Sequence, residues 1–264
     1  MGGKYFTATV RPNMDNDPGT VFDDGDLIFD WTPFEVPKGA VVLASMVITQ
    51  FGRDGVASAL DEDMQLYFAK SINGVAPANL GTQHSMALAA TTTKSRRNII
   101  GMTFLDRSAM VDTVNVLHGF STWSNTGTGT NMHESGNWMV LEGDPSYAST
   151  EGYQTIWVAG LGNAGANGGE YLFDTSIASA EDGSANVAAD MTGANVVLKT
   201  SGTDPRNVFA PGDIAIGSTG GPTMEVVSVD TATQMTVKNL SEQLDNAEII
   251  NPRNPFTFVF GFHL

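Results

Sequence analysis

Apolar and polar residues alternate along most of the chain in short runs, and glycine or proline separates one run from the next. Every second side chain of a β-strand faces the same side, so this period predicts strands. No segment keeps apolar residues at helical spacing over about 12 residues, so we expect no substantial helix. The expected strands span residues 4–10, 26–31, 41–49, 64–69, 99–105, 111–117, 138–141, 155–159, 170–174, 196–199, 213–216, 224–229, 235–237 and 256–262.

Two of these strands have patterns that predict their surroundings. Phe256, Phe258, Phe260 and Phe262 recur at every second position, so all four rings face one side of a strand that we place in a core. The run 41–48 is apolar on both faces, so we expect that strand to be covered on both sides.

The segment 208–237 has the pattern of three strands joined by two turns. The residues that we place on one face are Ile214, Ile216, Met224, Val226 and Ser228, and those on the other are Val227 and Val229. Turn signals occur at Pro211-Gly212, Gly220-Gly221-Pro222 and Asp230-Thr231. Short strands joined by such tight turns can close into a small barrel, which would supply a packing surface and no catalytic side chains.

The composition changes after Asp174, where residues 175–192 are small and polar, as in an exposed excursion. We therefore predict an all-β protein whose main domain is a jelly roll or β-sandwich of residues 1–194, completed by residues 251–264. Residues 195–250 would form a small β-barrel-like module inserted near the C-terminus. The alternative is two consecutive domains, in which the phenylalanine strand closes the second.

The overall composition limits the possible functions. The chain has 264 residues, no cysteine and a net charge of −16, which excludes disulfides, thiolate metal ligands and a cysteine nucleophile. Such acidity disfavours binding to nucleic acid, because the phosphate backbone is also negative. The first ten residues lack the apolar core of a signal peptide, and no apolar run is long enough to span a membrane. We therefore expect a soluble protein that is made without export and binds no membrane.

Motifs that resemble catalytic or cofactor sites lack the context that their chemistry requires. Gly160, Gly162 and Gly165 match a dinucleotide-binding fingerprint, but another glycine-rich turn follows instead of a helix, so we interpret the motif as a hairpin loop. Six aspartates crowd the first 30 residues without the ligand spacing of an EF-hand, so Asx-turns explain them better than calcium does. They are Asp15, Asp17, Asp23, Asp24, Asp26 and Asp30.

Histidine and serine patterns also give no catalytic motif. The histidines are far apart at His84, His118, His133 and His263. His133-Glu134 lacks the second histidine of a zinc protease, and no Gly-x-Ser-x-Gly elbow occurs. We therefore predict no catalytic residues, no cofactor and no metal. A β-sandwich hydrolase with two catalytic carboxylates remains an alternative, because the sequence does not give the distance between two carboxylates in the folded protein.

Three residues are candidates for contacts with a partner. Trp123 lies in a polar, glycine-rich stretch, where it would act as an anchor if the loop is exposed. Arg96 and Arg97 belong, with Lys94, to the tightest basic cluster of the chain, although such a cluster is also typical of a solvated loop. The other tryptophans, Trp31, Trp138 and Trp157, could stack on sugar rings if exposed but are more typical of a core or subunit interface.

The chain resembles virion structural proteins of tailed bacteriophages, in particular the β-rich ones of marine phages. The resemblance is carried by the acidic, cysteine-free β composition and by two stretches of sequence. The first is Phe209-x-x-Gly212-Asp213-Ile214, continued by Val226-Val-Ser-Val-Asp230 and Met235-Thr-Val237; the second is Gly152-Tyr-Gln-Thr-Ile-Trp-Val-Ala-Gly-Leu-Gly162. It implies a non-enzymatic protein that decorates or cements a capsid, commonly as a homotrimer, in a virion assembled in the host cytoplasm.

The partners that this resemblance implies are the major capsid protein or other virion proteins. Two alternatives stay open. One is a jelly-roll capsid protein, which would fit the strand pattern better than the major capsid fold of tailed phages, because that fold needs a long helix. The other is a carbohydrate-binding or receptor-binding module of a virion.

Overall fold

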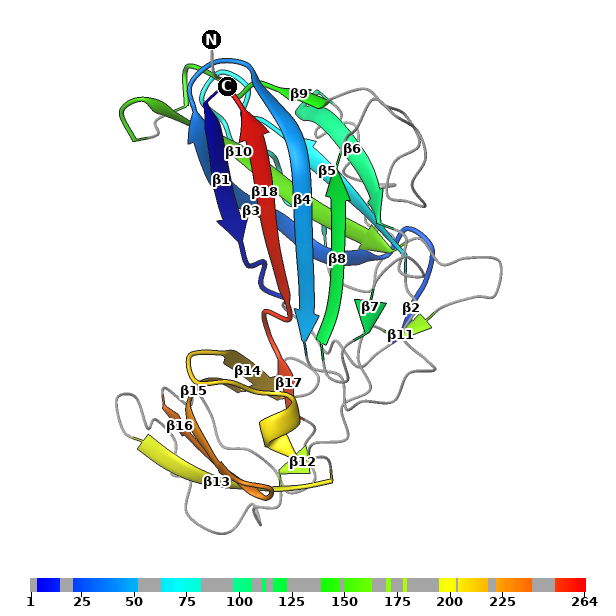
Figure 1. Cartoon of the computed structure of the whole chain (residues 1–264), viewed down its shortest axis with the longest axis vertical. Coiled ribbons are helices and arrows are strands. Elements are labelled where there is room, and N and C mark those ends of the chain that lie inside the picture. Colours follow the sequence, from blue (N-terminus) through cyan, green and yellow to red (C-terminus); the bar gives the residue numbers. More distant parts are fainter. Residues whose placement is uncertain are drawn as a thin grey trace.

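The computed structural model describes residues 4–14, 21–51, 63–81, 97–105, 111–112, 116–122, 139–147, 150–162, 170–171, 178–179, 195–202, 204–217, 222–238 and 250–264. These residues form a β-sandwich of two antiparallel sheets and a further β-sheet at one end of it (Figure 1). In the described part of the chain, no helix is long and apolar enough to cross a membrane.

The first sheet of the sandwich has four long antiparallel strands. In spatial order they are β1 (Tyr5–Val10), β18 (Phe256–His263), β4 (Val41–Phe51) and β8 (Val116–Thr122). Two short strands extend it: β7 (Val111–Asp112) pairs with β8, and β9 (Met139–Leu141) pairs with β4 beyond the end of β8.

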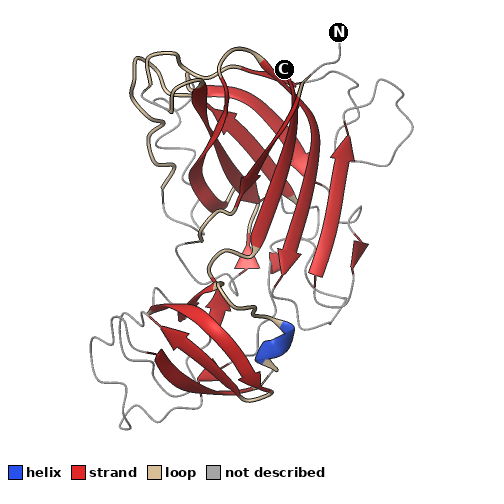
Figure 2. Ribbon diagram, turned by 60° about the vertical axis from the view of Figure 1, so that its left-hand side comes forward, coloured by secondary structure: helices blue, strands red, loops and turns tan. Residues whose placement is uncertain are grey.

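The second sheet faces the first, as the turned view in Figure 2 shows. Its order is β3 (Leu27–Pro37), β10 (Tyr153–Gly162), β5 (Met64–Ala69) and β6 (Ile99–Leu105), again antiparallel throughout. A separate two-stranded ladder pairs β2 (Val21–Phe22) with β11 (Glu170–Tyr171).

The connectivity of the eight long strands is that of a jelly roll. The first strand in chain order pairs with the eighth, the second with the seventh, the third with the sixth and the fourth with the fifth (β1–β18, β3–β10, β4–β8 and β5–β6). This is one long antiparallel hairpin rolled up so that alternate pairs fall in opposite sheets, which defines the double Greek key of jelly rolls. The predicted all-β sandwich is therefore confirmed.

The phenylalanine strand β18 lies at the centre of the sandwich core, as its period predicts. All four rings are fully buried. Phe258 and Phe260 stack with centroids 5.8 Å apart, and Phe34 of the opposite sheet lies 5.4 Å from Phe260. Aromatic pairs in such geometries contribute about 0.5–1.5 kcal/mol beyond the area that they bury. The rings of β18 thus join the two sheets.

The prediction that β4 is covered on both sides is wrong. Val41 and Leu43 are buried, but so are Met46 and Ile48, while Val47 is 43% exposed. The buried positions therefore change from odd to even numbers within the strand. A β-bulge explains the change, because the neighbouring pairs in the ladder are Phe262 with Leu43 and Gly261 with Ser45. The continuous apolar run is two half-buried alternating patterns joined at the bulge.

The further sheet contains the segment predicted as strand, turn, strand, turn, strand, and we call it the module. Its order is β12 (Ala178–Ser179), β13 (Asn195–Ser201), β16 (Gln234–Lys238), β15 (Thr223–Thr231), β14 (Ile214–Gly217) and β17 (Ile250–Pro252). Its buried core has its own residues: Leu198, Val208, Phe209, Ala215, Met224, Val226, Met235, Val237 and Ile250. None of them belongs to the sandwich core.

The predicted shared face is correct for Met224 and Val226 but wrong for β14 and for the end of β15. Ala215 pairs with Met224 and belongs to the module core, so Ile214 and Ile216 lie on the opposite face. Val226 pairs with Val237 and Ser228 with Thr236, so Val227 is an extra residue in a bulge. Val229 therefore packs against the module core, whereas the Ser228 hydroxyl bonds Asp230 at the surface. The described residues give no pairing between β12 and β17, so closure of the module into a barrel stays a prediction, as do the exact domain boundaries.

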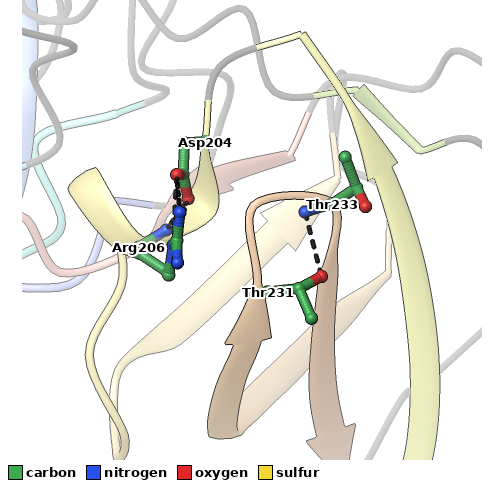
Figure 3. A network of polar contacts seen from close by, with 4 residues as sticks. All are labelled: Asp204, Arg206, Thr231 and Thr233. Carbon is green, nitrogen blue, oxygen red and sulfur yellow. Dashed lines mark hydrogen bonds and ion pairs between the residues drawn. The ribbon is translucent and has the colours of Figure 1, made fainter.

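Short-range polar contacts fix the turns of the module (Figure 3). Asp204 precedes the 3₁₀ helix Pro205–Asn207, and its Oδ1 accepts the backbone N–H of Arg206 at 3.0 Å. The Arg206 guanidinium lies 2.6 Å from the other carboxylate oxygen and lowers the pKa of Asp204. In the turn between β15 and β16, the hydroxyl of Thr231 accepts the N–H of Thr233 at 3.2 Å.

Candidate functional site

A pocket of about 320 Å³ lies at the edge of the sandwich where β1 ends and the chain of β3 bends. β1 and β3 are edge strands of the two different sheets, so the pocket lies where the sandwich is open. Its lining residues are Arg11, Asn13, Asp30, Trp31, Thr32 and Pro33.

A β-bulge in β3 shapes one side of the pocket. Thr32 pairs with Val158 of β10, but Phe29 pairs with Gly160, so Asp30 and Trp31 together face the single residue Ala159. A second irregularity follows between Phe29 and Leu27. Bulges of this kind bend a strand and redirect its side chains, and they are common beside binding sites.

Hydrogen bonds hold the bulge in one shape. Asp30 Oδ1 accepts the backbone N–H of Trp31 at 2.8 Å and that of Leu80 at 3.1 Å. The indole N–H of Trp31 donates to the carbonyl of Ala78 at 3.1 Å. The ring also packs against the small buried cluster of Leu27, Leu80 and Ala159. The segment around residue 80 thus fixes the orientation of a tryptophan that lines the pocket.

The opposite side of the pocket comes from the chain just after β1. Arg11 lies 40% exposed, with Nη2 3.2 Å from Oδ1 of Asp213, which is buried in the module. The other oxygen of Asp213 accepts the backbone N–H of Ala210 at 2.8 Å. Asn13 follows as an exposed residue. One pocket residue therefore also connects the sandwich to the module.

Backbone contacts reinforce this connection next to the pocket. The N–H of Met14 donates to the carbonyl of Arg253 at 2.7 Å, and the N–H of Arg253 donates to the carbonyl of Ile214 at 2.7 Å. The side chain of Asn254 accepts the N–H of Ile214 at 3.3 Å. The segment leading into β18 therefore bonds both the sandwich and the module.

The lining of the pocket is suited to binding. It combines an aromatic ring, donors on Arg11 and Asn13, a hydroxyl on Thr32 and a carboxylate on Asp30. Across the described part of the chain, no three His, Cys, Asp or Glu side chains are grouped so that they could hold a metal ion.

The structure places one of the three predicted interface residues. Arg97 is exposed in the turn before β6. Arg96 and Trp123 lie outside the described residues, so their expected contact role stays a prediction.

The other tryptophans and the glycine motif have structural roles where they are described. Trp157 is 5% exposed and packs edge-on against Tyr147 with centroids 5.0 Å apart, which is typical of a core residue. Gly160 and Gly162 lie within β10, so the interpretation of this motif as a hairpin loop is wrong for its first half. A side chain at Gly160 would overlap the ring of Phe29, so this glycine provides space for a core phenylalanine. Trp138 and Gly165 lie outside the described residues.

The aspartates of the N-terminal region lie partly in the described residues. Asp26 is buried, and its carboxylate accepts the N–H of Asp23 at 2.9 Å, which is a local turn as expected from the sequence. Asp15 and Asp17 lie outside the described residues. Of the pocket residues, the sequence analysis named Trp31 and Asp30 but missed the other four, which are Arg11, Asn13, Thr32 and Pro33. The polar residues Asp30 and Thr32 on either side of Trp31, within a largely apolar strand, were the available signal.

No protein-family model matches the chain. A search of the curated proteins likewise finds no match.

Proposed function

We propose that the protein is a structural component of a virus particle, of the decoration or cement type, that binds the capsid lattice non-covalently and stabilises it. The observation that carries the proposal is the jelly-roll pairing of the eight long strands, with a second β-module attached. Jelly rolls are frequent in viral capsid proteins, although lectin domains and cupins also have them. The proposal gives the chain no catalytic role.

The arrangement of the two parts supports contacts in two directions. The module lies at the end of the sandwich that is remote from the C-terminus, and each part has a separate core (Figures 1 and 2). A protein with two separately packed parts can bind one neighbour through the sandwich and another through the module. Such bridging between subunits is what cementing a lattice requires.

Exposed apolar side chains favour one face of the sandwich for the lattice. Tyr5, Val47 and Val140 are 55%, 43% and 58% exposed, and all three lie on the outer face of the first sheet. In the proposed function these three side chains are apolar anchors for the contact with the lattice. Met102 of β6, which is 50% exposed on the second sheet, is a matched residue on the opposite side.

Binding to native particles tests the proposal. The purified chain is added to particles stripped of it, and the bound fraction is measured by sedimentation, with mass photometry of the free chain. We expect a trimer that rebinds the particles, and we expect Val47→Glu to weaken rebinding at least tenfold while Met102→Glu leaves it within about twofold. A strictly monomeric chain without affinity for the particles contradicts the proposal.

A second candidate is a jelly-roll capsid protein that forms the shell itself, and the same strand pairing favours it. Electron microscopy of the chain alone distinguishes the two. Closed shells formed without any other protein would assign the chain to the capsid, whereas small oligomers that bind only preformed particles would assign it to decoration.

A further inference from the structure

We propose that the pocket between the ends of β1 and β3 binds one neutral pyranose unit, such as the terminal sugar of a cell-surface glycan. This inference does not depend on the proposed function, because it rests on the residues of the pocket alone. We call the lining residues Arg11, Asn13, Asp30, Trp31, Thr32 and Pro33 the sugar pocket.

Trp31 supplies the surface on which a sugar ring can stack. A pyranose has an apolar face of C–H groups and a rim of hydroxyls, so an aromatic ring beside polar groups is complementary to it. The indole N–H of Trp31 already donates to Ala78, and the ring packs against Leu27, Leu80 and Ala159. The ring is therefore held in place before binding, which reduces the entropy lost when a ligand is bound.

The polar residues of the sugar pocket fit hydroxyl groups. Each sugar hydroxyl both donates and accepts, and the pocket offers both functions. Arg11 and Asn13 carry N–H donors, whereas Asp30 and the amide oxygen of Asn13 accept. The hydroxyl of Thr32 donates to the carbonyl of Asp30 at 3.1 Å, so towards a ligand it accepts. A mixed set of this kind suits a polyol better than a purely apolar ligand, for which only Trp31 and Pro33 supply surface.

Charge disfavours an acidic ligand. The guanidinium of Arg11 lies 3.2 Å from the buried carboxylate of Asp213, so its positive charge is already compensated. Asp30 adds a carboxylate to the lining, and the whole chain carries a net charge of −16. A uronic or sialic acid would therefore meet repulsion that a neutral sugar does not.

The size of the pocket suits one sugar ring. Its volume of about 320 Å³ is at the lower end of the range of about 300–1,000 Å³ that is common for small-molecule sites. Pro33 and Asn13 are exposed at its rim, so the remainder of a glycan can extend into solvent.

Ligand-observed saturation-transfer NMR on the full-length chain tests the inference. The probes are the methyl glycosides of glucose, galactose and mannose, with methyl glucuronide as the acidic comparison. We expect at least one neutral glycoside to bind with a dissociation constant on the order of 1 mM, which is typical of a ligand of this size. Methyl glucuronide is expected to bind at least threefold more weakly.

Three variants locate the site. Trp31→Ala removes the stacking surface and is expected to weaken binding at least tenfold. Because Trp31 also packs on buried residues, Asn13→Ala provides a second test at an exposed residue outside the strands, with an expected loss of about threefold. Met102→Ala, on the outer face of the second sheet, is the control that leaves binding unchanged.

Several results would overturn the inference. One is that no neutral glycoside binds at 20-fold the expected dissociation constant. Another is binding that is unaltered in both Trp31→Ala and Asn13→Ala, which would place the site elsewhere. A third is tighter binding of the glucuronide, which would show that the pocket selects for negative charge.

Discussion

Asp144 is the residue whose contacts have the clearest consequence for the stability of the protein. Its carboxylate accepts the N–H of Gly74 at 3.0 Å, the hydroxyl of Ser71 at 3.2 Å, and the N–H and hydroxyl of Ser146 at 2.9 and 2.6 Å. These donors favour the ionised form, and the bond from Gly74 contributes most to a pKa of about 2, below the ordinary 3.8. The chain after β5 is thus tied to the chain after β9.

The lowered pKa of Asp144 predicts a pH-dependent stability. A carboxylate with a lower pKa in the folded state stabilises that state above its unfolded pKa, and the contribution is lost as pH falls toward 2. We expect Asp144→Asn to cost about 1 kcal/mol at pH 7, or about 2–4 °C in Tm. The difference in Tm between the wild type and Asp144→Asn should become smaller between pH 4 and pH 2. Thermal unfolding measures both, with Glu142→Gln as a control for net charge, and a gap independent of pH would contradict the prediction.

The contact of Gly160 with Phe29 predicts a strong coupling between two core positions. A Cβ at residue 160 would overlap the Phe29 ring, which is 2% exposed, so Gly160→Ala is expected to cost about 1–3 kcal/mol. Phe29→Leu makes room, so the double variant should lose less than the sum of the single variants. Urea unfolding measures this, and Gly160→Ala with Phe262→Leu on the other sheet is the control expected to be additive. Additivity with Phe29→Leu as well would contradict the prediction.

At the scale of elements, the sequence predicts strands well wherever a period of two continues without interruption. The phenylalanine strand was predicted at 256–262 and is observed as β18, Phe256–His263, with its rings in the core. The bulges in β3, β4 and β15 were not predicted, because one extra residue shifts the phase of a pattern without changing its composition. Partner strands decide where such a residue is accommodated, and a single sequence does not show them.

The tight turn at residues 72–75 could have been predicted from its turn residues. Ile72 and Val75 exchange backbone hydrogen bonds around Asn73 and Gly74, which both have positive φ. Asn-Gly is the preferred pair for this tight hairpin turn, so the signal was present in the sequence. The pocket differs, because the residues after β1 meet Asp30 and Trp31 only through the packing of two edge strands. The period of apolar residues within a strand does not show which edge strands pack against each other.

The separate cores of sandwich and module predict that the sandwich folds without the module. Replacing residues 172–252 by a flexible Gly/Ser linker of about 15 residues keeps every residue of the sandwich core. We expect a folded protein whose free energy of unfolding is lower by about 2 kcal/mol, from the lost bonds at the connection. This corresponds to a fall of about 4–8 °C in Tm. Circular dichroism with thermal unfolding checks it, and loss of cooperative unfolding would contradict it.

At the scale of the whole molecule, the described residues connect sandwich and module through a small set of contacts. Arg11 pairs with Asp213, and Arg253 bonds both Met14 and Ile214 through its backbone. The chain enters β18 directly after these contacts, so the central strand of the sandwich begins where the module is held. In the proposed function, this connection sets the angle between the surface that binds the lattice and the module that meets a neighbour.

The Arg11–Asp213 pair predicts a measurable, salt-sensitive coupling between the two parts. Arg11 is 40% exposed, so the pair is partly screened, and we expect a coupling free energy of about 0.5–1 kcal/mol in a double-mutant cycle of Arg11→Ala and Asp213→Asn. Asn at 213 can still accept the N–H of Ala210, so the cycle removes the charge without removing that turn contact. Arg11→Lys, which keeps the charge, should retain most of the coupling. In 1 M NaCl the coupling free energy should fall by about half or more. Small-angle scattering of the Arg11→Ala variant should show a broader range of module orientations than the wild type. Additive effects of the two substitutions at low salt would show that the pair does not hold the module in place.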